Sequence, residues 1–343
     1  MQYRITRSSK LLNKKGELVQ RGYATFPLLK YRRMDVARKL RLKEWDYYLI
    51  YNNECAVALT IGYSVNLLLI SASLIDLLNQ KETTKTAIRI VPRKKFSMPE
   101  SSQRGDIKYQ NKTLSLSILH QGSTRMIRFF MKDFIKNGNM KLSLQLSHEP
   151  KDSMVIASPF LEGKKLFVYN QKINGMHACG NVKLGYQSFT FSPDNSYAAL
   201  DWGRGVCPYH TTWYWSMAQG MVCDNFFSFN LGYGLGDTSS TTENMLFFNG
   251  HPTKLEQVIF LIPKNNRNEL DYQKPWKITS SDKRIELDFV PILERKVHLS
   301  VKLLSTEQHR VYGSFSGTAI LEDGTLIFLK DFLGFAERVE NFW

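Results

Sequence analysis

The stretch that decides the fold runs from Ala56 to Ile75 and reads AVALTIGYSVNLLLISASLI, twenty residues without a charged side chain. Its length alone satisfies a simple test for a membrane-spanning helix. From Val57 to Leu69, however, large apolar residues alternate with small or polar ones, and this period of two is typical of a strand with one buried face. We therefore predict one or two β-strands in a protein core rather than a transmembrane helix.

The same alternation recurs along the chain, at residues 113–118, 141–147, 285–289 and 325–329. Turn-forming residues stand between these runs, and Asp323-Gly324 predicts a hairpin because it separates two of them. A helical pattern is confined to short segments, chiefly the basic stretch Met34–Lys43. The sequence therefore predicts an all-β protein of antiparallel strands, arranged as barrels or sandwiches, with few short helices.

The chain length favours two domains, because 343 residues exceed what one hydrophobic core usually fills. The best boundary lies near residues 147–160, where the segment His148–Asp152 interrupts a strand pattern. We therefore expect a basic N-terminal domain over residues 1–155 and a second domain over residues 156–343.

The net charge of +15 is concentrated in the first of these regions. Residues 1–155 carry 28 basic and 12 acidic side chains, whereas residues 156–343 carry 18 and 19. Such a positive field attracts phosphates, nucleic acid or anionic lipid headgroups, but it also serves solubility alone. We expect peripheral contact with an anionic membrane as one use of this charge, and we do not expect nucleic-acid binding because no recognition motif is present.

The cysteine content indicates a reducing environment. The four cysteines form no C-x-x-C pair, which predicts reduced thiols in a cytoplasmic protein. The first residues, MQYRITRSSK, contain no apolar segment of the kind found in secretory signals. His177, Cys179, Cys207 and His210 are zinc-type ligands, but their spacing matches no common zinc framework, so we expect neither a metal nor a cofactor.

Residues 200–255 differ from the rest of the chain and form the candidate functional segment. They hold three of the six tryptophans and seven of the 21 glycines. Aromatic walls with a few polar groups are typical of small-molecule sites. Asp201 and Glu243 are the candidate general acids, because apolar surroundings raise the pKa of a carboxyl group. Arg204 is expected to bind an anionic group or to hold a carboxylate in place.

Further side chains are candidates for ligand binding because they are aromatic or polar. Most of them lie within residues 200–255, and three lie outside this segment. They are Trp202, Tyr209, His210, Trp213, Trp215, Asn230, Asn244, Trp45, Asp46 and Lys172. A purely structural alternative stays open. In that alternative the tryptophans fill a core, the glycines mark bulges, and Asp201 and Arg204 form an ion pair.

Five pieces of the chain together resemble a known family. They are Leu42–Tyr48 (LKEWDYY), Asp201–Gly205 (DWGRG) with Pro208-Tyr209, Trp213, Thr242-Glu243-Asn244 and Pro275-Trp276. In this order they are similar to the domain-of-unknown-function (DUF) family numbered twenty-eight hundred and four, over nearly the whole chain. Cys207 stands where this family is expected to carry a bulky aromatic residue.

The resemblance implies two consecutive lipocalin- or calycin-like antiparallel β-barrels, as in the tandem lipocalin-like proteins that include carotenoid hydratases and certain fungal cyclases. By fold analogy alone, it implies an apolar or amphipathic small molecule as ligand. Two hypotheses follow. One is a cofactor-free hydratase, isomerase or cyclase that uses a carboxyl group as general acid, and the other is a non-enzymatic carrier of hydrophobic ligands that docks on anionic membrane.

Overall fold

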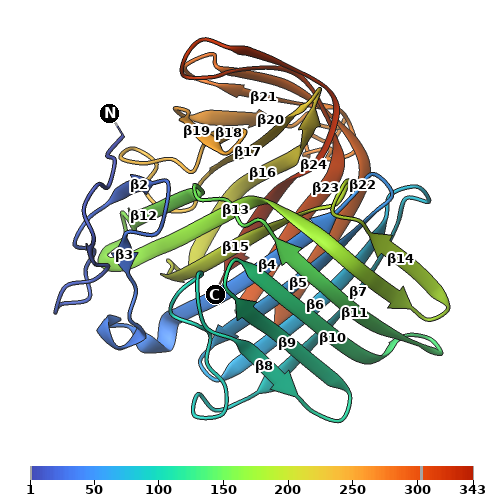
Figure 1. The fold of residues 1–343 in the computed structure, drawn as a ribbon. Coiled ribbons are helices and arrows are strands. Elements are labelled where there is room, and N and C mark those ends of the chain that lie inside the picture. Colours follow the sequence, from blue (N-terminus) through green and yellow to red (C-terminus); the bar gives the residue numbers. More distant parts are fainter. Residues whose placement is uncertain (1, 302–303, 343) are drawn as a thin grey trace. The chain divides into compact units, whose positions relative to one another are not determined.

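A computed structural model describes residues 2–301 and 304–342 of the chain (Figure 1). Strand accounts for 65% of the structure and helix for 2%, and the strands form two curled antiparallel half-barrel sheets. The prediction of an all-β protein of antiparallel strands with few short helices is therefore confirmed.

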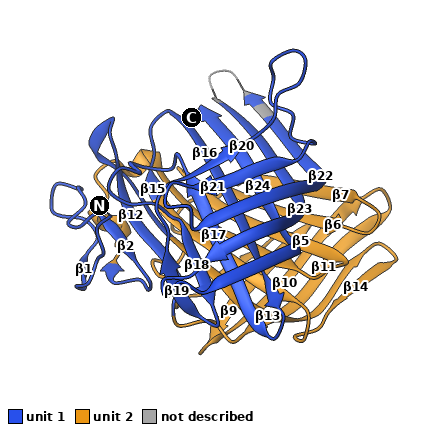
Figure 2. Ribbon diagram, turned by 90° about the horizontal axis from the view of Figure 1, so that it is seen from above, with its two compact units in different colours: residues 1–29, 152–170, 205–343 blue, residues 30–151, 171–204 orange. Residues whose placement is uncertain are grey.

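The chain divides into two compact units, which Figure 2 shows in different colours. Unit 1 comprises residues 1–29, 152–170 and 205–343, and unit 2 comprises residues 30–151 and 171–204. Two of the four boundaries between them fall within long strands, β13 (Gly163–Leu184) and β15 (Tyr197–Val206). The units differ in extent from the expected domains 1–155 and 156–343, which stay a prediction.

The main sheet of unit 2 has the strand order β7-β6-β5-β4-β15-β13-β11-β10-β9-β8, and β14 pairs with β13. Its remaining strands are β4 (Leu42–Tyr51), β5 (Cys55–Ser64), β6 (Leu67–Asp76), β7 (Lys81–Ile90), β8 (Ile107–Gln110), β9 (Leu114–Gln121), β10 (Thr124–Ile135), β11 (Gly138–Ser147) and β14 (Gln187–Phe191).

The uncharged stretch Ala56–Ile75 forms strands β5 and β6, as predicted. The two strands pair as a hairpin in which Ile61 lies opposite Ile70, and both side chains are buried. A register shift of one residue would move every buried side chain to the other face, so the alternation fixes the pairing. Within the described residues, no helix has both the length and the apolar character needed to cross a membrane.

The expected basic helix at Met34–Lys43 is wrong. That region contains two short 3-10 helices, η1 (Arg33–Asp35) and η2 (Lys39–Arg41), and β4 begins at Leu42. Val36 and Leu42 are buried, at 2% and 0% exposure, and their burial ties the chain down on either side of η2. Burial of these two apolar anchors thus outweighs the weak helical pattern.

The nine-stranded sheet of unit 1 has the order β19-β18-β17-β16-β24-β23-β22-β21-β20. Its strands are β16 (His210–Val222), β17 (Asn225–Tyr233), β18 (Met245–Phe248), β19 (His251–Lys254), β20 (Val258–Leu261), β21 (Trp276–Ser280), β22 (Ile285–Val301), β23 (Leu304–Ile320) and β24 (Leu326–Phe342). Two strands of unit 1 also belong to the larger sheet, where β12 (Met154–Phe160) pairs with β13 and with β2 (Gly22–Ala24). The strands β1 (Ser9–Lys10) and β3 (Leu29–Lys30) form a separate two-stranded sheet.

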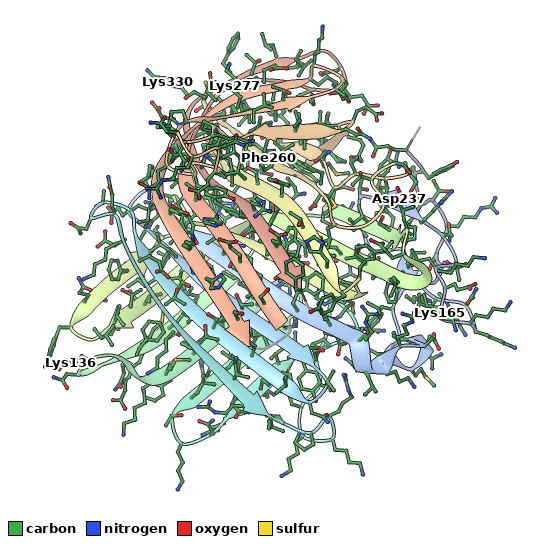
Figure 3. All side chains as sticks on the ribbon, turned by 180° about the vertical axis from the view of Figure 1, so that it is seen from behind. Lys136, Lys165, Asp237, Phe260, Lys277 and Lys330 are labelled. Atoms are coloured by element: carbon green, nitrogen blue, oxygen red, sulfur yellow. The ribbon has the colours of Figure 1, made fainter. Side chains whose placement is uncertain are left out.

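One face of this nine-stranded sheet carries an aromatic core. Phe229, Phe289, Phe315 and Trp276 are fully buried in it, together with Phe260, which Figure 3 labels. The hairpin predicted at Asp323-Gly324 is confirmed, because β23 and β24 pair up to Ile320 and Leu326 on either side of it. The core face is therefore established, and β16 also presents an opposite face that carries two tryptophans.

Candidate functional site

The segment Asp201–Gly205 lies within β15 and is an extended strand rather than a turn. Successive side chains of a strand point to opposite faces. Trp202 and Arg204 therefore share one face, whereas Asp201 shares the other with Gly203. The ion pair considered between Asp201 and Arg204 does not form, because residues three apart on a strand cannot face each other.

Arg204 belongs instead to a buried ionic cluster in unit 2. Its Nη1 donates to Asp46 Oδ1 at 3.0 Å, and its Nε lies 3.8 Å from Glu44 Oε1. The guanidinium lies 4.1 Å from the centre of the Trp202 ring. Three backbone carbonyls, those of Trp45, Gly203 and Pro99, accept further hydrogen bonds from it.

Glu44 receives two more arginines in the same cluster. Arg33 Nη2 donates to Oε1 at 2.8 Å and Arg93 Nη1 to Oε2 at 2.9 Å. Burial would raise the pKa of Glu44, but the hydrogen bonds from Arg33 and the charge of Arg204 lower it. For Asp46 burial prevails over Arg204, and the pKa is raised. The Tyr31 hydroxyl also donates to Glu44 Oε1, at 3.0 Å. We call Tyr31, Arg33, Glu44, Asp46, Arg93, Trp202 and Arg204 the Arg204 cluster.

The opposite face of β15 carries a second, smaller group of predicted residues. Trp45 Nε1 donates to Asp201 Oδ1 at 3.3 Å, and Lys172 Nζ lies 3.5 Å from Asp201 Oδ2. Gly203 makes room for the indole, because a Cβ at this position would lie 2.0 Å from the Trp45 ring. The structure thus places the Trp45 indole and the Lys172 ammonium group next to the Asp201 carboxylate.

A third group lies in unit 1 and includes the other candidate acid. Trp215 Nε1 donates to Asn230 Oδ1 at 2.7 Å. Asn230 Nδ2 in turn donates to the backbone oxygen of Glu243 at 2.7 Å and to its Oε2 at 3.3 Å. All three residues are buried, at 5%, 0% and 4% exposure. We call Trp215, Asn230 and Glu243 the Glu243 group.

Gly232 and Asn244 hold the surroundings of this group. The Gly232 N–H donates to Asn244 Oδ1 at 2.7 Å, and Asn244 Nδ2 donates to the Glu256 carbonyl at 2.8 Å. A Cβ at Gly232 would lie 2.5 Å from Glu243 Oε1, so only glycine leaves space for this carboxyl group. Asn244, expected to bind a ligand, thus connects β17 to the loop beyond β19.

The Glu243 group continues into a polar row that the sequence analysis missed. In the pairing register, Trp215 and Arg310 both lie opposite Glu337, on neighbouring strands. Arg310 Nη2 lies 2.7 Å from Glu337 Oε2, and the guanidinium lies 5.5 Å from the centre of the Trp215 ring. Gln308 Nε2 donates to the same Glu337 oxygen at 2.8 Å. Only the register of β16, β24 and β23 brings these distant residues together.

The remaining candidates lie apart from the Glu243 carboxyl group. Trp213 shares a face of β16 with Trp215, opposite Val339. Tyr209 and His210 are half exposed at the start of β16, where His210 stacks on Phe342 at 4.2 Å. Of the zinc-type ligands, His177 and Cys179 belong to unit 2, whereas Cys207 and His210 belong to unit 1. Over residues 2–301 and 304–342, no three such ligands are grouped to hold a metal ion.

Comparison with known proteins identifies a family and a fold. The chain matches the sequence profile of DUF2804, described as a domain of unknown function, over residues 2–343. No curated protein matches the sequence.

Among solved structures, a protein described as AttH-type from Nitrosomonas europaea is similar with a TM-score of 0.55 at 12% identity, over 92% of this chain and 96% of that one. Kievitone hydratase from Nectria haematococca is similar with a TM-score of 0.45 at 10% identity, over 98% of this chain and 97% of that one. CghA with Sch210972 is similar with a TM-score of 0.48 at 7% identity, over 87% of each chain. The likeness to the AttH-type protein extends to the fold alone.

Proposed function

We propose that this chain, which belongs to the DUF2804 family, binds an apolar or amphipathic small molecule and performs cofactor-free acid–base chemistry on it. The observation that carries the proposal is the Glu243 group. Here a buried carboxyl group, an amide that orients it and an indole are joined by hydrogen bonds. A largely apolar surface with a few placed polar groups is the usual character of a small-molecule site.

In this proposal Glu243 transfers the proton, Asn230 fixes the direction of its carboxyl group, and Trp215 provides an apolar wall. The reaction class is hydration, isomerisation or cyclisation, since each of these requires proton transfer to or from carbon or oxygen and no redox step. A positioned general acid or base typically contributes about 10²–10⁴-fold to the rate.

Asp201 is the second candidate carboxyl group. Its neighbours, the Lys172 ammonium and the Trp45 indole, are donors suited to a carboxylate that accepts hydrogen bonds. They favour a positioning role for Asp201 over proton donation, and Glu243 is therefore the residue to test first.

The experiment begins with the small molecules that co-purify with the protein, identified by mass spectrometry. Each is then incubated with unmodified protein and with Glu243→Gln, Asp201→Asn and the control Glu322→Gln, whose residue is exposed. We expect Glu243→Gln alone to abolish conversion while binding persists, because an amide cannot donate and recover a proton. The proposal fails if no small molecule co-purifies, or if Glu243→Gln converts the molecule as fast as the control.

A further inference from the structure

Lys254 ends strand β19, and its amine is buried beside the Glu243 group within unit 1. Its Nζ lies 2.6 Å from Thr242 Oγ1, 2.8 Å from the Asn244 carbonyl and 2.9 Å from the Leu255 carbonyl. The first two acceptors belong to the residues on either side of Glu243 in the sequence. Lys254 reaches them because it lies opposite Met245 in the hairpin of β18 and β19.

These contacts use all the hydrogen-bonding capacity of the side chain. An ammonium group has three donors and no acceptor, and three oxygen atoms surround Nζ. Thr242 is held from its other side as well, since its N–H donates to Gln2 Oε1 at 2.9 Å. One charged group thus contacts the residues on both sides of Glu243, through the hydroxyl of Thr242 and the backbone carbonyl of Asn244.

The side chain of Asn244 links Lys254 to the surroundings of the Glu243 carboxyl group. While the carbonyl of Asn244 accepts from Lys254, its Oδ1 accepts from the Gly232 N–H. Gly232 is the residue that leaves space for Glu243 Oε1. A shift of Asn244 therefore moves both the backbone next to Glu243 and the strand against which its carboxyl group lies.

We propose that Lys254 is the positioning residue for Glu243 and that its protonation state sets the geometry of the Glu243 group. This inference rests on the proposed function, in which Glu243 transfers the proton. An ammonium group holds all three acceptors, whereas a neutral amine has two N–H donors and must give one of them up.

Lys254 loses its proton near neutral pH, because burial lowers its pKa to about 7. The charges of Glu256, Glu243 and Asp282 act in the opposite direction, and the Tyr23 ring lies 5.2 Å from Nζ. The unfolded chain binds this proton more tightly, at the ordinary pKa of 10.5. The buried ammonium form of Lys254 therefore lowers the free energy of unfolding by its full amount below pH 7. The free energy of unfolding rises as the pH increases from about 7 to about 10.5.

The test compares Lys254→Met with the control Lys277→Met, whose side chain is 67% exposed and is labelled in Figure 3. The first measurement is an NMR pH titration of the Asn230 side-chain amide, which needs no ligand. We expect a midpoint near pH 7 in unmodified protein and in the control, and no such titration in Lys254→Met. A titration in Lys254→Met like that of the control overturns the inference.

The second measurement is affinity for the co-purified small molecule. We expect Lys254→Met to weaken it about tenfold, the size of one charged hydrogen bond, with the control unchanged. Equal affinities of the two variants overturn the inference, while Glu243→Gln decides the proposed function separately. If Lys254→Met does not fold, Thr242→Val replaces it. Removal of one acceptor should then lower the titration midpoint, and an unchanged midpoint is the contrary result.

Discussion

Units 1 and 2 each bury an arginine against a tryptophan and a carboxylate, but unit 1 also holds a buried carboxyl group, that of Glu243, which accepts a hydrogen bond from an amide. In unit 2, Arg204 lies 4.1 Å from the Trp202 ring centre, and Glu44 and Asp46 face arginines. In unit 1, Arg310 lies 5.5 Å from the Trp215 ring centre and pairs with Glu337 at 2.7 Å, whereas Glu243 accepts a hydrogen bond from the uncharged amide of Asn230.

This difference separates a structural role from a chemical one. Hydrogen bonds from guanidinium groups stabilise Glu44 as an anion and lower its pKa, whereas burial raises the pKa of Asp46 despite Arg204. A carboxylate that is fixed by several ion pairs, as Glu44 is, holds strands together but has little use for proton transfer. The Glu243 carboxyl group is oriented by a hydrogen bond from the neutral amide of Asn230, and on this contact we propose the Glu243 group for acid–base chemistry.

The largest expected effect comes from breaking the Arg204 cluster. Arg204→Met leaves the buried Asp46 carboxyl group without the guanidinium that faces it, and breaking a buried ion pair costs about 3–5 kcal/mol. Glu243→Gln keeps the shape of its side chain, so we expect it to cost less than about 1 kcal/mol. Urea unfolding of both variants measures the difference. Equal losses of stability would end the distinction between the two regions.

A smaller effect is expected at the glycine that accommodates Glu243. In Gly232→Ala the new methyl group would lie 2.5 Å from Glu243 Oε1 and 2.7 Å from the Tyr214 carbonyl oxygen. Overpacking of this kind costs about 1–3 kcal/mol. Gly62→Ala is the matched control, since its Cβ would be 3.7 Å from the nearest atom, in Leu69. Unfolding measurements that place the two variants level would contradict the tight fit around Glu243.

The smallest effect concerns basic residues outside the Arg204 cluster. Arg32, Arg38 and Lys39 are exposed, whereas Arg33 is bound to Glu44. If the basic surface docks on anionic membrane, each reversal Arg32→Glu, Arg38→Glu or Lys39→Glu should weaken vesicle binding by about 1 kcal/mol. Arg33→Glu should instead lower stability. Sedimentation with anionic vesicles at low salt tests this, and unmodified protein that stays in the supernatant would leave the charge without a membrane role.

The sequence was sufficient for the fold because its strongest signal is local. Alternation along Ala56–Ile75 reports burial of one face, and burial determines the register of β5 and β6. The helix expected at Met34–Lys43 failed for a non-local reason. Burial of Val36 and Leu42 against other parts of the chain outweighed a weak local preference.

The candidate site was predicted only as a set of residue types. Sequence spacing places Asp201, Trp202 and Arg204 in one group, whereas the strand geometry of β15 divides them between two faces. Lys254, Arg310 and Glu337 carried no local signal, since their partners depend on sheet register rather than on sequence spacing. Strand pairing determines where these residues lie, and the pairing of distant strands cannot be predicted from a single sequence.

The interleaving of the two units along the chain has a consequence for synthesis. Residues 1–29 belong to unit 1, but most of that unit is translated only after residue 204. The hydrogen bond from Gln2 Nε2 to the Leu255 carbonyl spans 253 residues. At about 5–20 residues per second, the start of the chain waits roughly 13–50 s for this partner. Gln2 therefore stays without this partner for that interval, whereas residues 22–24 can pair much earlier with residues 155–157 of β12.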